Sequence, residues 1–436
     1  MTTALLDELQ KWDSRLIEMA KDHGLDWFPI LYETCDYYEM IGSMAYHGMP
    51  SHYGHWSFGK SFERNHLMYN AGMQGLPYEL IINSNPSLAY LMEENPMYLQ
   101  VLIMAHCIGH SDFFKNNITF RHTHPENIIL RMRNAKRYID QLIEDPSVGV
   151  DQVENILDSA HALSYNVPRR YEPYVKQSEQ KRKLVEDIKA GVYRDSIITP
   201  DPEQIPLKPE VNVLAFLADQ SPDLEDWQRE IIKIVEEEAH YFMPQIRTKI
   251  MNEGWASYWH YRLMHELELD SGMHIPFLKT HNEVVRPHPG SINPYHLGFH
   301  MFKRIEERYG LEECFVARES LNDESFIRQY LTKEDCEDLE LFSYSLQRDE
   351  YKVDDVSDDD GWKKIKQDLI KQVGGNSIPI IMVDGIDESN VLCLIHEHDG
   401  RDLELDYADA VVQHISNLWG DVVRLDTIIE DEPFEI

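Results

Sequence analysis

The chain has 436 residues, of which 42% are hydrophobic, enough for a large core and long for one domain. It carries 77 Asp and Glu residues against 41 Lys and Arg residues, a formal net charge of -36. Because a charge of that sign repels phosphate backbones and anionic lipid, we expect neither nucleic acid nor a membrane surface as a partner. The five cysteines are scattered and show no C-x-x-C spacing, which predicts reduced thiols and a cytoplasmic location.

The N-terminal segment, residues 1–24, has apolar residues at helical spacing and acidic residues where a signal peptide would be basic. It is therefore expected to be a structural helix and not an export signal. Elsewhere no apolar stretch approaches the roughly 20 residues that a membrane-spanning helix needs.

Strands are expected in WFPILYETCDYY (27–38) and in YELIINS (78–84), which the turn signal Asn85-Pro86 follows. The next segment, MYLQVLIMAHCIGHSDFFKNN (97–117), predicts a helix by its length and by Pro96 at its start. Further helices are predicted within 126–165, 223–246 and 248–269. Residues 166–210 contain few large apolar side chains and several prolines, which is typical of an exposed excursion or linker.

The C-terminal part of the chain reads as strand, hairpin, helix and strand, with Asp384-Gly385 and Asp399-Gly400 as turns. We therefore predict a mainly helical α+β protein with a small β-sheet. Its expected parts are a main domain (1–310), an acidic connecting region (311–360) and a small α+β C-terminal domain (361–436).

His106 and His110 stand four residues apart in an apolar run, so on a helix both imidazoles lie on one face and can reach one metal ion. The later segment NEGWASYWH offers Glu253 as a third ligand, with His260 two turns further along nearly the same face. Two imidazoles and a carboxylate are typical of a catalytic zinc site, with iron as a second possible metal. The alternative is a pair of hydrogen-bonded core histidines.

The familiar zinc-peptidase motif H-E-x-x-H has a glutamate that activates water, and here Cys107 takes that position. A buried thiol is a poor substitute for that base. We predict that Glu79 or His260 assists the bound water. Otherwise the site binds metal without hydrolysing a substrate.

Two other segments combine polar and aromatic residues. In HYGHWSFGKSFERN (52–65), His55, Lys60 and Arg64 could bind a carboxylate or phosphate group of a substrate, or form a buried ion-pair cluster. In the expected Pro/Gly loop after residue 280, His281 and Asn293 are further candidates for substrate binding, since loops often carry function.

Five blocks of the sequence resemble the SpoVR family, stage V sporulation protein R and its relatives in non-sporulating bacteria. They occur in order over about residues 10–310, as HWSFGKSFERN, ELIINSNPSLAYLMEEN, MAHCIGHSDFFKNN, QIRTKIMNEGWASYWH and INPYHLG. The family blocks match His106, Gly109, His110, Asn252, Glu253, Gly254, Trp255 and Ala256. A small residue is common in the family at the position of Cys107, so the resemblance implies that the missing base is a family trait.

The resemblance also implies a link to the spore cortex, a peptidoglycan layer, or to stress responses. In those settings relatives accompany a PrkA-like serine kinase and a von Willebrand-type partner. We therefore expect a zincin-like main domain acting as a metal-dependent hydrolase on an amide bond in a peptide or wall precursor. The competing expectation is a non-catalytic regulator or scaffold in a kinase-linked pathway, with a structural or vestigial metal site.

Overall fold

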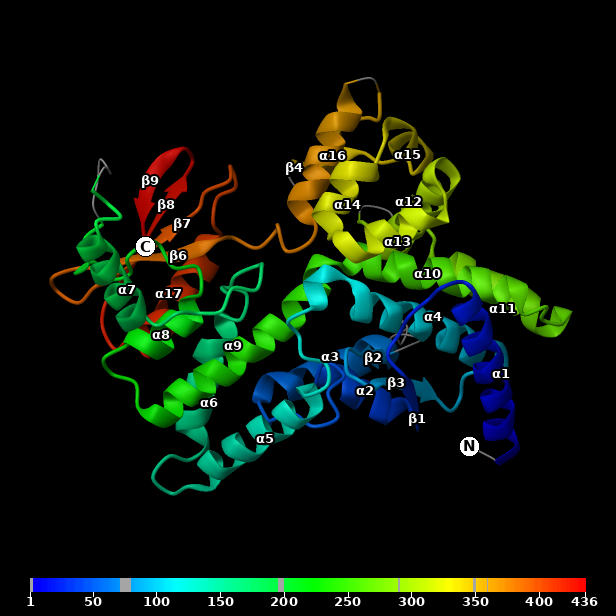
Figure 1. Ribbon diagram of the computed structural model, residues 1–436, viewed down its shortest axis with the longest axis horizontal. Helices are drawn as coiled ribbons and strands as arrows, with labels where there is room; N and C mark the ends of the chain where they lie inside the picture. The colour runs from blue at the N-terminus through cyan, green and yellow to red at the C-terminus, as the bar shows by residue number, and fades with distance from the viewer. Residues whose placement is uncertain (1–2, 71–79, 195–199, 289–290, 348–349, 359) are drawn as a thin grey trace. The chain divides into compact units, whose positions relative to one another are not determined.

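The computed structural model describes residues 3–70, 80–194, 200–288, 291–347, 350–358 and 360–436. These residues form two compact units, each assembled from two stretches of chain (Figure 1). Unit 1 comprises residues 1–136 and 244–377, and unit 2 comprises residues 137–243 and 378–436. The predicted α+β class is confirmed, because helices dominate both units and the sheets are small.

The elements of unit 1 are α1 (Thr3–Asp22), β1 (Ile30–Cys35), α2 (Tyr37–Ala45), α3 (Trp56–Asn70), β2 (Leu80–Ile82), β3 (Ser87–Met92), α4 (Met97–Asn116), the 3-10 turn η1 (Ile118–Phe120), α10 (Lys249–Glu266), α11 (Ser271–Val284), α12 (Pro294–Tyr309), α13 (Leu311–Ser320), α14 (Asp323–Tyr330), α15 (Lys333–Asp338), β4 (Ser343–Gln347), β5 (Glu350–Asp355) and α16 (Gly361–Gln372). Two further helices cross the boundary between the units along the chain, α5 (Ile128–Glu144) and α9 (Asp226–Arg247).

The sheet of unit 1 has the strand order β1-β3-β2. β1 pairs with β3 in parallel, and β2 pairs with β3 in antiparallel orientation. Both strands that the sequence predicted in this region are present, and the chain passes directly from β3 into α4. The zincin-like description of this domain stays a prediction.

Helix α4 forms the centre of unit 1, between the sheet and helix α10, and α12 lies on the far side of α10 (Figure 1). Pro96 precedes its first residue, as the sequence predicted. Every residue from Leu99 to Phe114 is buried, which explains why this segment is apolar on all sides. Helix α10 is buried in the same way from Ile250 to His260.

Glycines allow the helix axes of this layer to approach one another. A Cβ on Gly109 of α4 would lie 2.7 Å from the Cα of Ala256 on α10. Where α10 meets α12, a Cβ on Gly254 would lie 2.4 Å from the backbone of Gly298. Any side chain at these positions would push the helices apart. His106 and His110 flank Gly109 in the sequence, and Glu253 precedes Gly254, so the predicted metal ligands lie beside these contacts.

Unit 2 contains α6 (Val150–Ala162), α7 (Gln177–Ala190), α8 (Val213–Gln220), β6 (Ile381–Ile386), β7 (Leu392–His396), α17 (Leu405–Trp419), β8 (Val423–Ile429) and β9 (Glu432–Glu435). Its sheet has the order β6-β7-β8-β9. The first strand, the helix and the last strand expected in the C-terminal part are present as β6, α17 and β8. The hairpin expected within residues 390–406 is wrong, because this segment holds one strand, β7, which pairs with β6 and β8. The expected turn at Asp384-Gly385 is wrong, because this pair lies inside β6 at a bulge in its pairing with β7.

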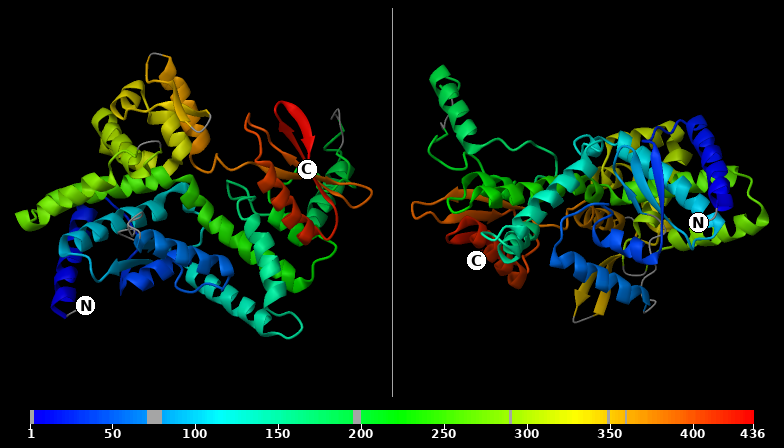
Figure 2. Two further views of the ribbon diagram at one scale, coloured as in Figure 1. Left: turned by 180° about the vertical axis from the view of Figure 1, so that it is seen from behind. Right: turned by 90° about the horizontal axis from the view of Figure 1, so that it is seen from below.

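The C-terminal segment belongs to the same unit as residues 137–243. The indole ring of Trp419 stacks on Phe216, and Glu210 forms a bridge with Val383. Residues 166–210, expected as an excursion or linker, contain α7, which stands away from the sheet of its own unit (Figure 2).

The acidic region 311–360 is a folded part of unit 1 that contains α13, α14, α15 and the β4–β5 hairpin. Buried residues such as Phe326 and Cys336 join its helices to the core of the unit. A high density of acidic residues was therefore not sufficient evidence for a linker. Among the helices that the structure describes, none is both long and apolar enough to cross a membrane.

Candidate metal centre

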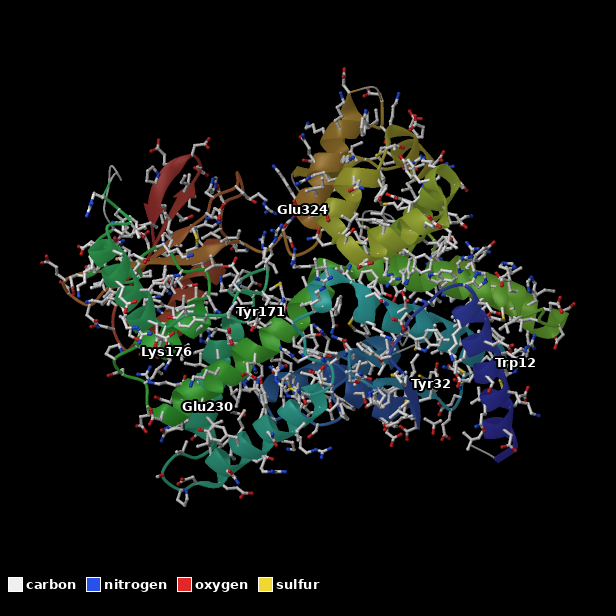
Figure 3. The ribbon with its side chains drawn as sticks, viewed as in Figure 1. Trp12, Tyr32, Tyr171, Lys176, Glu230 and Glu324 are labelled. Carbon is white, nitrogen blue, oxygen red and sulfur yellow. The ribbon has the colours of Figure 1, made fainter. Side chains whose placement is uncertain are left out.

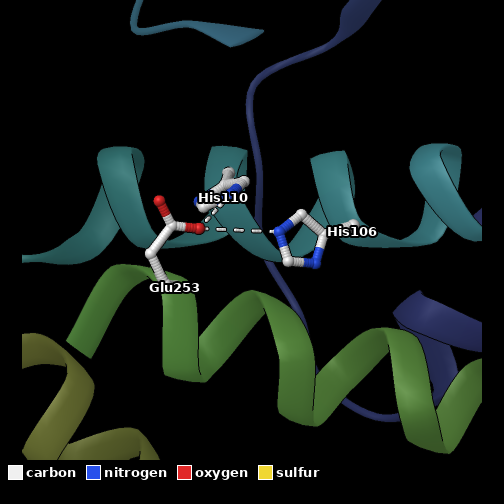
Figure 4. Close-up of side chains that lie close together, drawn as sticks. All are labelled: His106, His110 and Glu253. Carbon is white, nitrogen blue, oxygen red and sulfur yellow. Dashed lines mark ion pairs between the residues drawn. The ribbon is translucent and has the colours of Figure 1, made fainter. Parts of the chain in front are cut away.

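Three predicted ligands meet between α4 and α10. His106 and His110 project from consecutive turns of α4 toward Glu253 of α10 (Figure 4). The Nε2 atoms of His106 and His110 lie 3.7 and 3.3 Å from Glu253 Oε2. One donor atom from each residue lies within 4.8 Å of the others. The three residues are buried, with exposed fractions of 2%, 4% and 6%.

The carboxylate of Glu253 is held in its ionised form. Burial alone would raise its pKa, but Lys249 and the two imidazoles hold the pKa well below its usual value. Lys249 Nζ lies 2.5 Å from Oε1. In the described part of the chain, the buried Oε2 atom accepts no well-oriented hydrogen bond. An ionised oxygen directed at two imidazole nitrogens is suited to a cation.

The second ring nitrogen of His110 has a defined partner. Its Nδ1 lies 2.9 Å from Oδ1 of Asn252, the residue before Glu253. Since an amide oxygen only accepts, Nδ1 donates its proton, and Nε2 is the ring nitrogen that faces Glu253 and can bind a metal. Hydrogen bonds of this kind orient metal-binding histidines in known sites.

His106 is oriented by a chain of histidines. Its Nδ1 lies 2.8 Å from Nδ1 of His260, and His260 Nε2 lies 2.8 Å from Nδ1 of His281. Burial and the neighbouring imidazoles lower the pKa of His260 well below its usual value, and burial lowers that of His281 to about 4. Neutral rings can donate along this chain in either direction, and donation from His106 to His260 to His281 is the direction that ligation by His106 Nε2 requires. That arrangement leaves the Nε2 lone pair of His106 facing Glu253.

This donor set fits a first-row transition metal. Neutral imidazoles suit zinc and iron, and a carboxylate completes the three-ligand set found in catalytic zinc sites. The Nδ1 atom of each histidine is engaged in a hydrogen bond, so Nε2 is the nitrogen available to a metal beside the ionised Glu253. The choice of zinc or iron stays a prediction.

Cys107 does not belong to the ligand face. It follows His106 by one residue, which turns its side chain about 100° around the helix axis. Its thiol is fully buried. The pKa of Tyr32 is raised mainly by burial of the tyrosine, and Cys107 raises it further. Tyr32 extends from β1 (Figure 3), and its hydroxyl lies 3.5 Å from the carbonyl oxygen of Met104. Cys107 therefore lies off the helix face that carries His106 and His110.

The other predicted site residues have the following positions. Glu79 lies outside the described residues, so its role stays a prediction. His55 precedes α3, where its Nδ1 lies 2.7 Å from Ser57 Oγ. Lys60 and Arg64 are exposed on α3, and Lys60 lies 5.6 Å from the ring centre of Trp56. Their binding of a substrate also stays a prediction.

His281 and Asn293 have structural contacts in unit 1. The sequence placed His281 in a loop, but it lies in the last turn of α11, which continues to Val284. Asn293 caps α12, and its Nδ2 donates to the carbonyl oxygens of Val284 and Arg286. These bonds tie the loop before α12 to the end of α11. The assignment of both residues to substrate binding stays a prediction.

Two contributors to the site were not assigned a role from the sequence. Lys249 precedes Glu253 by four residues, the spacing of a helical ion pair, and that spacing could have identified it. The ring of Tyr295, in the first turn of α12, stacks on His106 with 6.1 Å between ring centres. No local pattern in the sequence connects Tyr295 with His106, because the two residues are 189 positions apart.

Comparison with known proteins identifies the relationship. The family described as "SpoVR like protein" matches residues 3–378, and the "SpoVR-like C-terminal domain" matches residues 377–430. The chain belongs to the SpoVR family. The predicted resemblance is thus confirmed, and the SpoVR-like C-terminal domain coincides closely with the final segment of unit 2.

A SpoVR-family relative is the "Uncharacterized protein YcgB" of Escherichia coli (strain K12). It is 34% identical over 482 residues, covering 99% of this chain and 94% of the relative. No solved structure matches the chain.

Proposed function

We propose that this SpoVR-family protein is a metal-dependent hydrolase in which His106, His110 and Glu253 bind zinc or iron. The observation that supports it is the convergence of two oriented imidazoles on one ionised, buried carboxylate oxygen. Three protein ligands leave a tetrahedral ion one position for water or substrate. The bound ion would supply Lewis acidity, which polarises a carbonyl group and activates water.

The chain's own residues would perform the supporting steps. Asn252 and His260 hold the two imidazoles in the ligating tautomer, and Lys249 keeps Glu253 ionised. Both ring nitrogens of His260 contact other imidazoles, so we assign His260 to orienting His106. Glu79 is proposed as the general base, the role for which Cys107 is unsuited. The proposed substrate is an amide bond in a peptide or wall precursor, in a spore-cortex or stress pathway.

A second candidate is a non-catalytic regulator or scaffold with a structural metal site, acting with a PrkA-like serine kinase. Burial of all three ligands favours this alternative, since a closed metal site needs no access for substrate. The two candidates differ in whether an external ligand can reach the metal.

Metal content by plasma mass spectrometry tests the site itself. Wild-type protein is compared with the variants His110→Ala and Glu253→Gln, and His124→Ala serves as control because His124 is exposed away from the ligand set. We expect about one zinc or iron per chain in the wild type and the control, and its loss in both ligand variants. Metal-free wild-type protein that also fails to take up added zinc would reject the site.

Access to the metal separates catalysis from a structural role. The metal is replaced by Co²⁺, and the protein is titrated with a small hydroxamate while the visible spectrum is followed. A saturable spectral change supports the hydrolase and justifies assays with peptides and wall precursors. An unchanged spectrum at saturating hydroxamate would favour the regulator.

A further inference from the structure

Lys249 gives the two oxygens of Glu253 different surroundings. Its side chain is 59% exposed, yet its Nζ reaches 2.5 Å from Oε1 of the buried Glu253 carboxylate. The other oxygen, Oε2, faces His106 and His110. One oxygen of this ligand is therefore bound to an ammonium group, and the other is directed at the imidazoles.

Lys249 does not stabilise the helix end on which it lies. It is the first residue of α10, where the helix dipole disfavours a positive charge. The adjacent N–H groups of Ile250 and Met251 donate to the carboxylate of Asp323, whose pKa Lys249 also lowers, so this anion offsets part of the unfavourable charge. A cation at this position is explained by its bond to Glu253, four residues later.

We propose that Lys249 is a positioning residue that makes Glu253 a one-oxygen metal ligand. This inference rests on the proposed metal site. A carboxylate can bind a metal through one or both oxygens, and the second mode fills a coordination position that water or substrate could use. By binding Oε1, Lys249 keeps that position open.

Three variants test this role. Lys249→Met removes the ammonium group but retains much of the apolar stem, and Lys249→Arg keeps a donor for Oε1. Lys279→Met is the matched control, because Lys279 forms an exposed i, i+4 pair with Glu283 on α11. Each protein is loaded with Zn²⁺ for X-ray absorption and with Co²⁺ for visible absorption, since coordination geometry determines both signals.

In Lys249→Met we expect the bound metal to gain an oxygen neighbour and the visible Co²⁺ absorption to weaken. We expect Lys249→Arg and Lys279→Met to match the wild type. Wild-type protein that binds metal, together with an unchanged Lys249→Met spectrum, would overturn the inference and leave the metal site intact. The same change in Lys279→Met would also overturn it. Failure of the wild type to bind either ion would instead reject the proposed function.

Discussion

The Cα of Ala256 lies 2.7 Å from the position that a Cβ on Gly109 would occupy. Gly109 stands between His106 and His110, so this close approach of α4 and α10 occurs beside the ligands. Contact between these two backbones is what allows Glu253 to reach both imidazoles. The spacing of the ligands thus depends on a residue that cannot bind metal.

Gly109→Ala should therefore impair both folding stability and metal binding. A new Cβ must push backbone away from backbone, and we expect a loss of about 1–3 kcal/mol in the free energy of unfolding. Urea titration monitored by tryptophan fluorescence measures it. Gly59→Ala is the control, because Gly59 is an exposed helical position with no heavy atom within 4 Å of the added Cβ. That change should stabilise the protein by about 0.5–1 kcal/mol.

Asn252 should contribute to metal affinity without touching the metal. In Asn252→Leu the Nδ1–H of His110 loses its acceptor, and we expect zinc to bind about 10–100-fold more weakly. Asn252→Asp keeps an acceptor oxygen and should remain nearer the wild type. Competition with a chromophoric chelator gives both affinities. Equal affinity in wild type and Asn252→Leu would argue against the assigned tautomer of His110.

Zinc should stabilise the folded chain. A metal that binds only the native state at 100 times its dissociation constant adds about 2.7 kcal/mol to the free energy of unfolding. We expect a higher thermal midpoint on adding zinc to the chelator-treated wild type. Glu253→Gln should show little increase, because the amide removes the negative charge between the imidazoles. An equal rise in both proteins would place the zinc elsewhere.

His281 should make the protein less stable in acid. Its pKa in the folded state is about 4, below the usual 6.5, because it is buried beside other histidines. The unfolded chain binds more protons between these values, so stability falls as the pH drops from about 6.5 to 4, by up to about 3 kcal/mol. His281→Gln keeps an acceptor for His260 and should lose less stability over this range.

Denaturant titration at several pH values checks the His281 prediction. His288→Gln is the control, because His288 is exposed and its replacement should leave the wild-type pH dependence in place. If the free energy of unfolding of His281→Gln falls with decreasing pH as steeply as that of the wild type, the acid sensitivity comes from other groups.

The sequence predicted the parts of the site that depend on helix periodicity. Four-residue spacing placed His106 and His110 on one face, and the length of the apolar run around them, with Pro96 at its start, predicted the helix. Glu253 was predicted to meet the two histidines from another helix, but local patterns did not predict the remaining contacts across helices. The contacts of His260 with His106 and of Asp323 with the start of α10 depend on tertiary packing. Helix α11 was not predicted, since Pro276 lies inside it and the prolines after it suggested a loop from residue 280.

The ligands belong to two distant stretches of chain. α4 lies in the first stretch of unit 1 and α10 in the second, with residues 137–243 of unit 2 between them. During synthesis on the ribosome, His106 and His110 emerge well over 100 residues before Glu253, so the nascent chain first offers a bare histidine pair without its anionic partner. A protein truncated anywhere before residue 253 can never form the complete ligand set. Retained metal would therefore report that both stretches of unit 1 have been made and have folded together.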